Sequence, residues 1–201
     1  MLESIPIEDI QKVTVAAAES VIDLHGSMDK NLIDGAAVNA MRAALNNIAM
    51  AGTVVIGEGQ KDNAPMLRTG EKVGNGLGIA VDIAVDPIDG TSLVAKGKVG
   101  AVSLIAFSPS NTMFNPEDNF YMYKLVTGHE AASKVSITRP LVENLHIIAE
   151  AKSKKINDLV VNVLRRPRHE NLALELQSLG ITVRFFDDGD VTAALATCLP
   201  H

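Results

Sequence analysis

The feature that most constrains this chain is the stretch at residues 82–91, which reads Asp-Ile-Ala-Val-Asp-Pro-Ile-Asp-Gly-Thr. Large apolar residues occupy the odd positions from Ile79 to Val85, and small or acidic residues occupy the even positions. This period of two is typical of a β-strand with one packed face. Pro87 has no N–H to donate to a neighbouring strand, so we expect the strand to end there. Gly90 permits a positive φ and predicts a sharp turn.

The acids near the end of this strand are candidates for a metal and phosphate site. Asp82 and Asp86 share a face but lie about 13 Å apart at about 3.3 Å per residue, so they cannot bind one ion together. Asp86 and Asp89 are separated by a proline turn, so their carboxylates can converge. Two carboxylates beside the hydroxyls of Thr91 and Ser92 suit a hard divalent cation next to a phosphate. The alternative is a surface turn, in which Pro, Asp and Gly are common.

Two further acids stand at the ends of predicted elements. Asp34 occupies the position of an N-cap, ahead of an Ala-rich helix expected up to about Met50. Glu58 follows a short apolar strand and lies between Gly57 and Gly59, which permit close approach of backbone and ligand. The alternative for Glu58 is a solvated side chain on a glycine turn.

The remaining pattern of apolar and polar residues predicts alternating helices and strands. Helices are expected at residues 7–24, 34–50, 141–151, 170–179 and at the end of the chain, and strands at residues 53–56, 99–107, 120–126, 159–164 and 181–186. Helix and strand alternate from residue 141 onward, which is a layered α/β pattern, whereas the first part mixes longer helices with a sheet, as in α+β proteins. We therefore expect two lobes, residues 1–130 and 131–201, with a boundary near residues 127–140.

A basic cluster at residues 165–169, Arg-Arg-Pro-Arg-His, follows the predicted strand 159–164. Arginine binds phosphate through two parallel hydrogen bonds, so this cluster predicts an anion site. The alternative is a solvated basic loop. Tyr121 and Tyr123 lie in the expected strand 120–126, where most tyrosines simply pack.

Composition excludes several classes of function. The chain has 201 residues, of which 47% are hydrophobic, enough for one sizeable core or two small ones. Its net charge of −6 and its lack of a basic stripe or aromatic platform argue against nucleic-acid binding. The single cysteine, Cys198, cannot form a disulfide within the chain and favours a reducing cytoplasm. No run approaches the roughly 20 apolar residues of a membrane span, and no signal peptide is expected.

Several motifs in a fixed order resemble a known family. The stretch at residues 86–91 looks like the signature of the metal-dependent, lithium-sensitive sugar and inositol phosphatases. The other matching stretches are Asp29–Asn31, Asp34–Arg42, Gly52–Gly59, Ala64–Leu67 and Gly70–Gly74. Together, from near residue 8 to the last residue, they resemble class II fructose-1,6-bisphosphatase of the bacterial type.

This resemblance implies a fold and an activity. The fold is a layered αβαβα sandwich of the sugar phosphatase type, with an incomplete second layer. The activity is metal-dependent hydrolysis of the 1-phosphate of fructose 1,6-bisphosphate to fructose 6-phosphate and phosphate, in gluconeogenesis. Sedoheptulose 1,7-bisphosphatase activity, inositol phosphatase activity and a truncated, non-catalytic metal-binding product remain alternatives. A cytoplasmic homo-oligomer that binds neither nucleic acid nor membrane is expected.

The resemblance also implies roles for individual residues. Two or more Mn²⁺ or Mg²⁺ ions are expected on Asp34, Glu58, Asp86 and Asp89. Such hard cations take oxygen ligands, and a pair of them can hold both the attacking and the leaving oxygen in line. Thr91 is expected to orient or help deprotonate the attacking water, and Lys30 to neutralise charge. The substrate is expected to contact Asp89, Gly90, Thr91, Tyr121, Arg166, Pro167, Arg168, Asp188, Gly189 and Asp190.

The chain departs from the family pattern in three ways. Asp89 stands where many members carry a longer Glu, and Gln60 and Asn63 stand where acids are common. The family also continues past residue 201, with a Gly-rich stretch and a further metal-ligating glutamate. We therefore expect a truncated chain that is weakly active or inactive.

Overall fold

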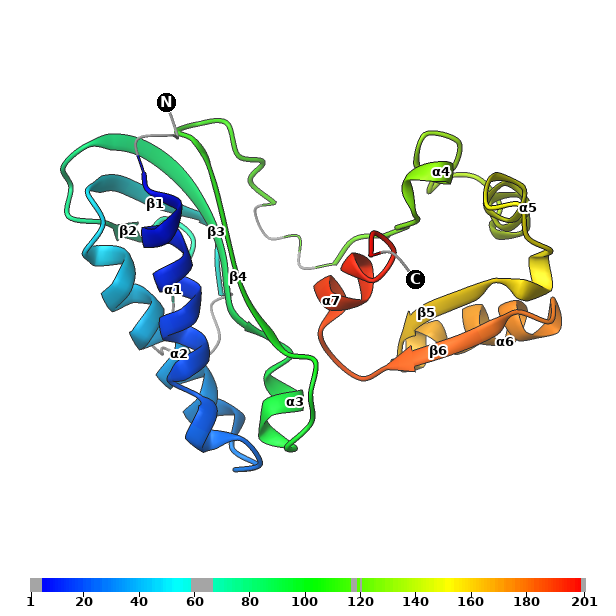
Figure 1. The fold of residues 1–201 in the computed structure, drawn as a ribbon, viewed down its shortest axis with the longest axis horizontal. Coiled ribbons are helices and arrows are strands. Elements are labelled where there is room, and N and C mark those ends of the chain that lie inside the picture. Colours follow the sequence, from blue (N-terminus) through cyan, green and yellow to red (C-terminus); the bar gives the residue numbers. More distant parts are fainter. Residues whose placement is uncertain (1–4, 59–66, 117–118, 120, 200–201) are drawn as a thin grey trace. The chain divides into compact units, whose positions relative to one another are not determined.

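The computed structural model of this chain describes residues 5–58, 67–116, 119 and 121–199. It divides into two compact units, Met1–Asn119 and Phe120–His201 (Figure 1). This division falls earlier in the chain than the boundary expected near residues 127–140. The two functional lobes expected at residues 1–130 and 131–201 stay a prediction, and each unit is described by itself.

The first unit contains a four-stranded sheet in the order β2-β1-β3-β4. Its strands are β1 (Met50–Ile56), β2 (Lys72–Val73), β3 (Ile79–Asp89) and β4 (Val102–Pro109). β1 is antiparallel to β2 and parallel to β3, and β3 is antiparallel to β4. The long strand β3 therefore has a partner on each side, and its odd-numbered apolar residues Val81 and Ile83 are completely buried in the core.

Two helices cover one face of this sheet (Figure 1). The helical segments of the first unit are α1 (Ile7–Glu19), the 3₁₀ turn η2 (Ile22–Leu24), α2 (Lys30–Asn46) and α3 (Thr91–Ala95). The core between α1, α2 and the sheet is aliphatic, with Val13, Ile33, Met41, Leu45 and Val54 fully or almost fully buried. The expected helix at residues 7–24 thus ends at Glu19, and a separate 3₁₀ turn follows.

The prediction that Pro87 ends the strand was wrong. Pairing between β3 and β4 shifts register between Asp86 and Asp89, and it resumes with Asp89 opposite Val102. Pro87 lies inside this irregularity, where a β-bulge leaves a residue out of the ladder and needs no N–H from it. The strand therefore carries both acids within one element.

The prediction that Asp34 caps the second helix was also wrong. α2 begins at Lys30, and the side chain of its N-cap residue, Asp29, accepts a hydrogen bond of 3.0 Å from the Leu32 N–H. One carboxylate is enough to satisfy an exposed N–H group of the first turn. Asp34 consequently lies inside the helix with its side chain available for another contact. α2 ends at Asn46, and Met50 already belongs to β1.

The second unit has the alternating order that its sequence pattern predicts. Its elements are α4 (His129–Ala132), α5 (Leu141–Ala151), η3 (Ile156–Asp158), β5 (Val160–Leu164), η4 (Pro167–His169), α6 (Glu170–Ser178), β6 (Thr182–Phe186) and α7 (Asp190–Leu195). β5 and β6 are parallel, with Val163 opposite Phe185. Leu145 of α5 and Leu176 of α6 belong to the small core of this unit. Both units are therefore mixed α/β structures, which agrees with the predicted fold class in its content of helices and strands.

The predicted strand at residues 120–126 was wrong over the residues that the structure describes. Residues 121–128 form no regular secondary structure. Tyr121 and Tyr123 are 80% and 94% exposed, so they do not pack into a core as their aromatic character suggested. Alternation of apolar and aromatic residues predicts a strand only if a partner strand is available, and in the described part of this unit β5 and β6 pair only with each other.

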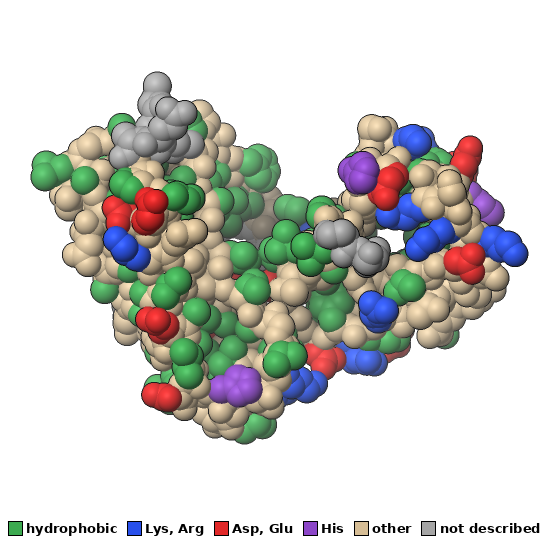
Figure 2. Space-filling model, viewed as in Figure 1, with side chains coloured by type: hydrophobic (Ala, Val, Ile, Leu, Met, Phe, Trp, Pro, Cys, Tyr) green, Lys and Arg blue, Asp and Glu red, His purple; other side chains and the backbone are tan. Residues whose placement is uncertain are grey.

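The surface agrees with the composition. On the described residues of the face in Figure 2, lysines and arginines are interspersed with acids and form no broad basic patch. Among the residues that the structure describes, no helix combines the length and the apolar character that a membrane span requires.

One buried acid of β3 has a structural role. Asp82 is only 5% exposed, and its Oδ2 accepts hydrogen bonds of 3.0 and 3.1 Å from the N–H groups of Thr112 and Met113. Burial alone raises the pKa of Asp82, but the amides of Met113, Asn111 and Thr112 and the charge of Lys72 outweigh it, so the net pKa is lowered. The carboxylate thus anchors the turn after β4.

We predict that Asp82→Ala lowers the free energy of unfolding by about 1–3 kcal/mol, because two N–H groups lose their acceptor. The lowered pKa means that this contribution is present above pH 3.8, the usual value, and is lost as the pH falls through the folded-state value. Urea titrations of the chain at pH 7 measure the difference. Asp23→Ala, at an exposed acid of η2, is the control, and an equal effect of both substitutions contradicts the anchoring role.

Candidate active site

The turn after β3 sets the position of the acids at its end. Gly90 has φ of 99° and immediately precedes α3, so the predicted positive φ at this residue is confirmed. A Cβ at this position would also lie 3.2 Å from Leu93 Cδ1 and 3.3 Å from Ala101. The chain therefore needs glycine to pass directly from Asp89 into the helix that begins with Thr91.

A hydrogen bond joins this turn to α2. Thr91 Oγ1 lies 2.8 Å from Asp34 Oδ1 and 3.1 Å from the Ile88 carbonyl oxygen, and both are acceptors. A hydroxyl has one proton, so the two acceptors share it, and the lone pairs of Oγ1 can accept from a third group. Two residues that are 57 positions apart in the sequence thus meet side chain to side chain.

The four predicted metal ligands act on one another electrostatically. Burial raises the pKa of Asp86 first, the charges of Glu58 and Asp89 raise it further, and Asp34 adds a smaller contribution. The Ile88 N–H lowers the pKa, but the net result is a value of about 7. The structure therefore brings Glu58, Asp89 and Asp34 close enough to Asp86 to raise its pKa, and we call these four carboxylates the acid cluster. Their role as metal ligands stays a prediction.

Glu58 reaches the acid cluster from the end of β1. Its N–H donates to the Leu67 carbonyl at 3.0 Å, and a Cβ on Gly57 would lie only 2.0 Å from the same oxygen. The glycine before the acid is therefore required by a close backbone approach, as the sequence indicated. Gly59, Gln60 and Asn63 lie outside the described residues.

Lys30 is exposed at the start of α2. The loop before it is tied to α3 by two backbone hydrogen bonds, from the Gly26 N–H to the Val94 carbonyl at 2.8 Å and from the Met28 N–H to the Ala95 carbonyl at 2.9 Å. Sequence reasoning missed this connection, because backbone pairing between distant loops leaves no pattern in side-chain types. It fixes the start of α2 against α3.

The acid cluster has the donor chemistry of a site for hard cations, because all four side chains offer carboxylate oxygens. Within the described ranges, no three Asp, Glu, His or Cys side chains are already placed together as ligands of one ion. The carboxylates of the acid cluster therefore influence the pKa of Asp86, but in the described part of the chain they are not arranged around the position of a single ion.

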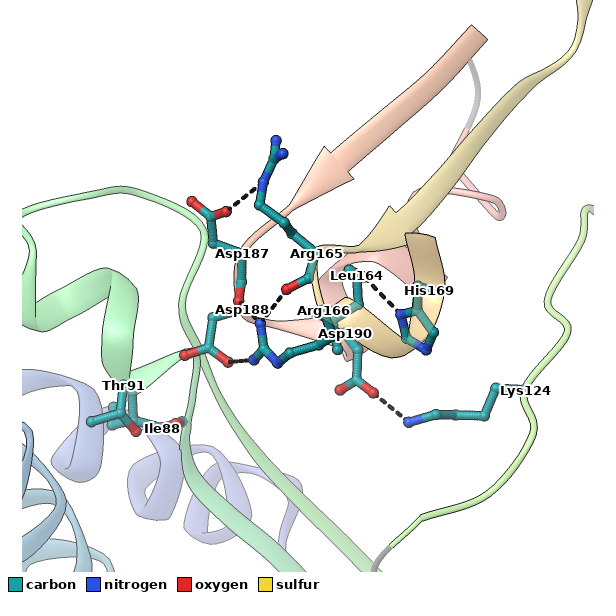
Figure 3. A network of polar contacts seen from close by, with 10 residues as sticks. All are labelled: Ile88, Thr91, Lys124, Leu164, Arg165, Arg166, His169, Asp187, Asp188 and Asp190. Atoms are coloured by element: carbon teal, nitrogen blue, oxygen red, sulfur yellow. Dashed lines mark hydrogen bonds and ion pairs between the residues drawn. The ribbon is translucent and has the colours of Figure 1, made fainter. Parts of the chain in front are cut away.

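In the second unit, the predicted phosphate-binding arginines are engaged with the loop after β6 (Figure 3). Arg166 Nη1 donates to the carbonyl oxygens of Arg165 and Asp187, both at 2.8 Å, and its Nη2 lies 4.0 Å from Asp188 Oδ1. The Arg165 guanidinium lies 4.5 Å from the centre of the Phe185 ring, and its Nε donates to Asp187 Oδ1 at 3.2 Å. These two arginines hold the ends of the parallel strands together.

The remaining predicted substrate residues lie close by in the same unit. The Arg168 guanidinium stands 5.1 Å from the centre of the Tyr121 ring, a cation–π contact. Pro167 begins η4, and Gly189 is buried directly before α7. Asp190 forms an ion pair with Lys124, which the sequence analysis did not single out. An isolated lysine in an irregular segment gives no signal of its own.

The chain also matches known proteins over most of its length. Residues 6–201 match the sequence model of the family described as bacterial fructose-1,6-bisphosphatase, glpX-encoded. The chain belongs to this family. The resemblance to class II fructose-1,6-bisphosphatase, inferred above from short motifs, is thereby confirmed.

Individual relatives agree with this assignment. The chain is 45% identical over 192 residues to fructose-1,6-bisphosphatase 1 class 2 of Escherichia coli strain K12, which covers 96% of this chain and 57% of the relative. The identity and coverage are the same for the fructose-1,6-bisphosphatase class 2 proteins of Escherichia coli O6:H1 and Shigella flexneri. The chain thus spans 57% of the length of these bisphosphatases.

We predict that the stability of the metal-free chain falls as the pH rises. The pKa of Asp86 is about 7 in the folded chain and 3.8 when unperturbed, so the folded state binds this proton more tightly. Its stabilising effect is present below about pH 4 and is lost as the pH rises to about 7, at a cost of up to about 4 kcal/mol.

The measurement is urea unfolding in the presence of a chelator between about pH 4 and pH 8. Asp86→Asn removes the titrating group and is expected to be more stable than the parent at pH 8. Asp23→Asn serves as the matched control and keeps the parent slope. A parent chain whose stability does not fall over this range contradicts the electrostatic coupling.

Proposed function

We propose that this chain forms part of a metal-dependent phosphatase that hydrolyses the 1-phosphate of fructose 1,6-bisphosphate to fructose 6-phosphate and phosphate. The observation that supports this most directly is the acid cluster, in which burial and the charges of three carboxylates raise the pKa of Asp86, and Asp34 accepts a hydrogen bond from the Thr91 hydroxyl. Crowded carboxylates of this kind cost free energy unless a cation balances them. The family assignment favours a sugar bisphosphate as the substrate.

In this proposal Asp34, Glu58, Asp86 and Asp89 hold two or more Mn²⁺ or Mg²⁺ ions. Such ions supply positive charge to the phosphoryl oxygens as negative charge develops on them. Burial and the neighbouring carboxylates raise the pKa of Asp86 to about 7, so a bound cation favours its ionised form. Asp89, which is 7% exposed at the end of β3, is the most buried of the four.

The protein's own groups orient the water and the phosphate. The Thr91 hydroxyl donates to Asp34, so its oxygen can accept a hydrogen bond from the attacking water. A proton can then pass from the water to Thr91 Oγ1 while the hydroxyl proton passes to Asp34. The N–H groups at Gly90 and Thr91 offer hydrogen bonds to the phosphate. Lys30 adds a positive charge at the start of α2.

Residues of the second unit bind the sugar and its second phosphate in this proposal. The carboxylates of Asp188 and Asp190 accept hydrogen bonds from sugar hydroxyls, and Tyr121 provides a ring and a hydroxyl. Arg166 through Arg168 face the second phosphate. Because Arg166 already holds backbone oxygens, the exposed Arg168 is the arginine best able to bind a phosphate through both of its outer nitrogens.

We also infer the finer properties that the resemblance implies. These are the five-layer αβαβα sandwich, assembly as a homo-oligomer and a cytoplasmic location. The layering of helices on a sheet within each unit supports the first, and the single cysteine is compatible with the last. Size-exclusion chromatography with light scattering tests the oligomer.

The test of the proposed function is phosphate release from fructose 1,6-bisphosphate with Mn²⁺, for this chain and for a version extended to the family's full length. Because the chain spans 57% of its relatives, we expect turnover chiefly in the extended version. Asp86→Asn abolishes it, and Asp23→Asn leaves it unchanged. Sedoheptulose 1,7-bisphosphate and inositol 1-phosphate are run in parallel. Absence of phosphate release from every substrate in the extended version contradicts the proposal.

A readout independent of turnover tests the metal. Mn²⁺ binds the folded chain only, so it is expected to raise the unfolding midpoint and to flatten the pH dependence of stability. Asp86→Asn reduces this stabilisation, whereas Asp23→Asn keeps it. No stabilisation of the parent chain by Mn²⁺ contradicts the assignment of the acid cluster as a metal site.

We predict that Thr91→Ala lowers kcat by about 10²–10⁴, the range for a group that handles a proton, while stabilisation by Mn²⁺ is nearly unchanged. Thr91→Ser keeps the hydroxyl and is expected to retain most of the activity. Steady-state kinetics of the extended chain measure both, with Thr14→Ala on α1 as the control. If KM rises in Thr91→Ala and kcat holds, the residue binds substrate and does not act on the water.

A further inference from the structure

Two side-chain contacts hold the irregular segment at residues 121–128 in the second unit, which we call the tyrosine segment. Tyr121 lies under the Arg168 guanidinium, 5.1 Å from ring centre to Cζ. Three residues later, Lys124 forms an ion pair with Asp190 Oδ2 at the start of α7 (Figure 3). A segment without helix or strand is positioned mainly by such contacts.

The turn that carries Asp190 is held from two directions. Arg166, at the end of β5, donates to the Asp187 carbonyl at 2.8 Å and faces Asp188 at 4.0 Å. Lys124 approaches Asp190 from the tyrosine segment (Figure 3). The ion pair therefore joins the two places, Tyr121 and the Asp188–Asp190 turn, at which the sugar is proposed to bind.

We propose that Lys124 is a positioning residue, which fixes Tyr121 relative to Asp190 through its ion pair with that carboxylate. The kinetic part of this inference rests on the proposed function, but the positional part does not. The Lys124 and Asp190 side chains are 57% and 40% exposed, and an exposed ion pair contributes little to global stability. The consequence of losing it is accordingly local: the tyrosine segment moves more freely, and unit 2 stays folded.

The chain offers a direct optical probe of this position. It contains two tyrosines and no tryptophan. Tyr123 is 94% exposed and has no part in the proposed site, so Tyr123→Phe leaves Tyr121 as the single fluorophore. The fluorescence anisotropy of Tyr121, and its quenching by acrylamide, then report how firmly the tyrosine segment is held.

In the Tyr123→Phe chain we expect Lys124→Met to lower the anisotropy of Tyr121 and to increase its quenching. Asp190→Asn has the same effect, and the double variant adds nothing further, because both substitutions remove one interaction. Lys124→Arg keeps the charge and restores the parent values. Lys155→Met, at an exposed lysine of the same unit, is the matched control and leaves them unchanged. The thermal midpoint stays the same throughout.

The kinetic arm uses the extended chain. Lys124→Met is expected to raise KM for fructose 1,6-bisphosphate about tenfold with kcat nearly unchanged. A less firmly held site loses binding energy equally for the substrate and for the transition state. Lys124→Arg is expected to recover most of the affinity. A purely structural role would instead lower the thermal midpoint and the amount of active protein, and it would leave the KM of the remaining enzyme unchanged.

The outcomes separate the two proposals. Unchanged anisotropy in Lys124→Met, failure of Lys124→Arg to restore it, or a lowered thermal midpoint overturns the positioning role. An altered anisotropy with an unchanged KM in an active enzyme overturns its importance for the sugar. If the extended parent releases no phosphate, the proposed function fails, and the fluorescence arm alone still decides whether Lys124 positions Tyr121.

Discussion

The structure of the first unit depends on what the carboxylates of one buried strand, β3, contact. β3 is paired on both sides, and a charge on such a strand is costly unless a partner satisfies it. Asp82 meets two backbone N–H groups, and the net pKa of its carboxyl is lowered. Asp86, four residues further along, is partly buried near other carboxylates, and burial and their charges raise its pKa. The same residue type on the same strand therefore has a lowered pKa in one place and a raised pKa in the other.

The local backbone explains why Asp86 and Asp89 lie together at one end of the strand. The shift of register between Asp86 and Asp89 bends β3 without ending it, and Gly90 then turns the chain at once into α3. This puts Thr91 within hydrogen-bond distance of Asp34 on α2. A strand that ended at Pro87 would release Asp89 into a loop, so the bulge keeps both acids on a rigid support.

Much of this arrangement was predictable from the sequence. Alternation from Ile79 to Val85 predicted β3, and the alternating order after residue 141 predicted the second unit. Sequence reasoning failed where a tertiary partner decides the outcome: a bulge accommodates Pro87, Asp29 rather than Asp34 caps α2, and the expected strand at residues 120–126 lacks a partner in the described part of the chain. The convergence on Asp86 was proposed from motif chemistry, but its electrostatic consequence required coordinates.

The two units differ in how their charged side chains are compensated. In the acid cluster, burial and the charges of neighbouring carboxylates raise the pKa of Asp86, so binding of a proton or a cation is favoured there. In the second unit, three acids form ion pairs with cationic side chains of the same unit. These pairs are Arg165 with Asp187, Arg166 with Asp188 and Lys124 with Asp190. A guanidinium that already supports a loop gains less from a phosphate than a free one does, because it must give up existing contacts. The arginine-rich sequence therefore overstates the charge that is available to a ligand, and much of its contribution is to give the loop after β6 a fixed shape.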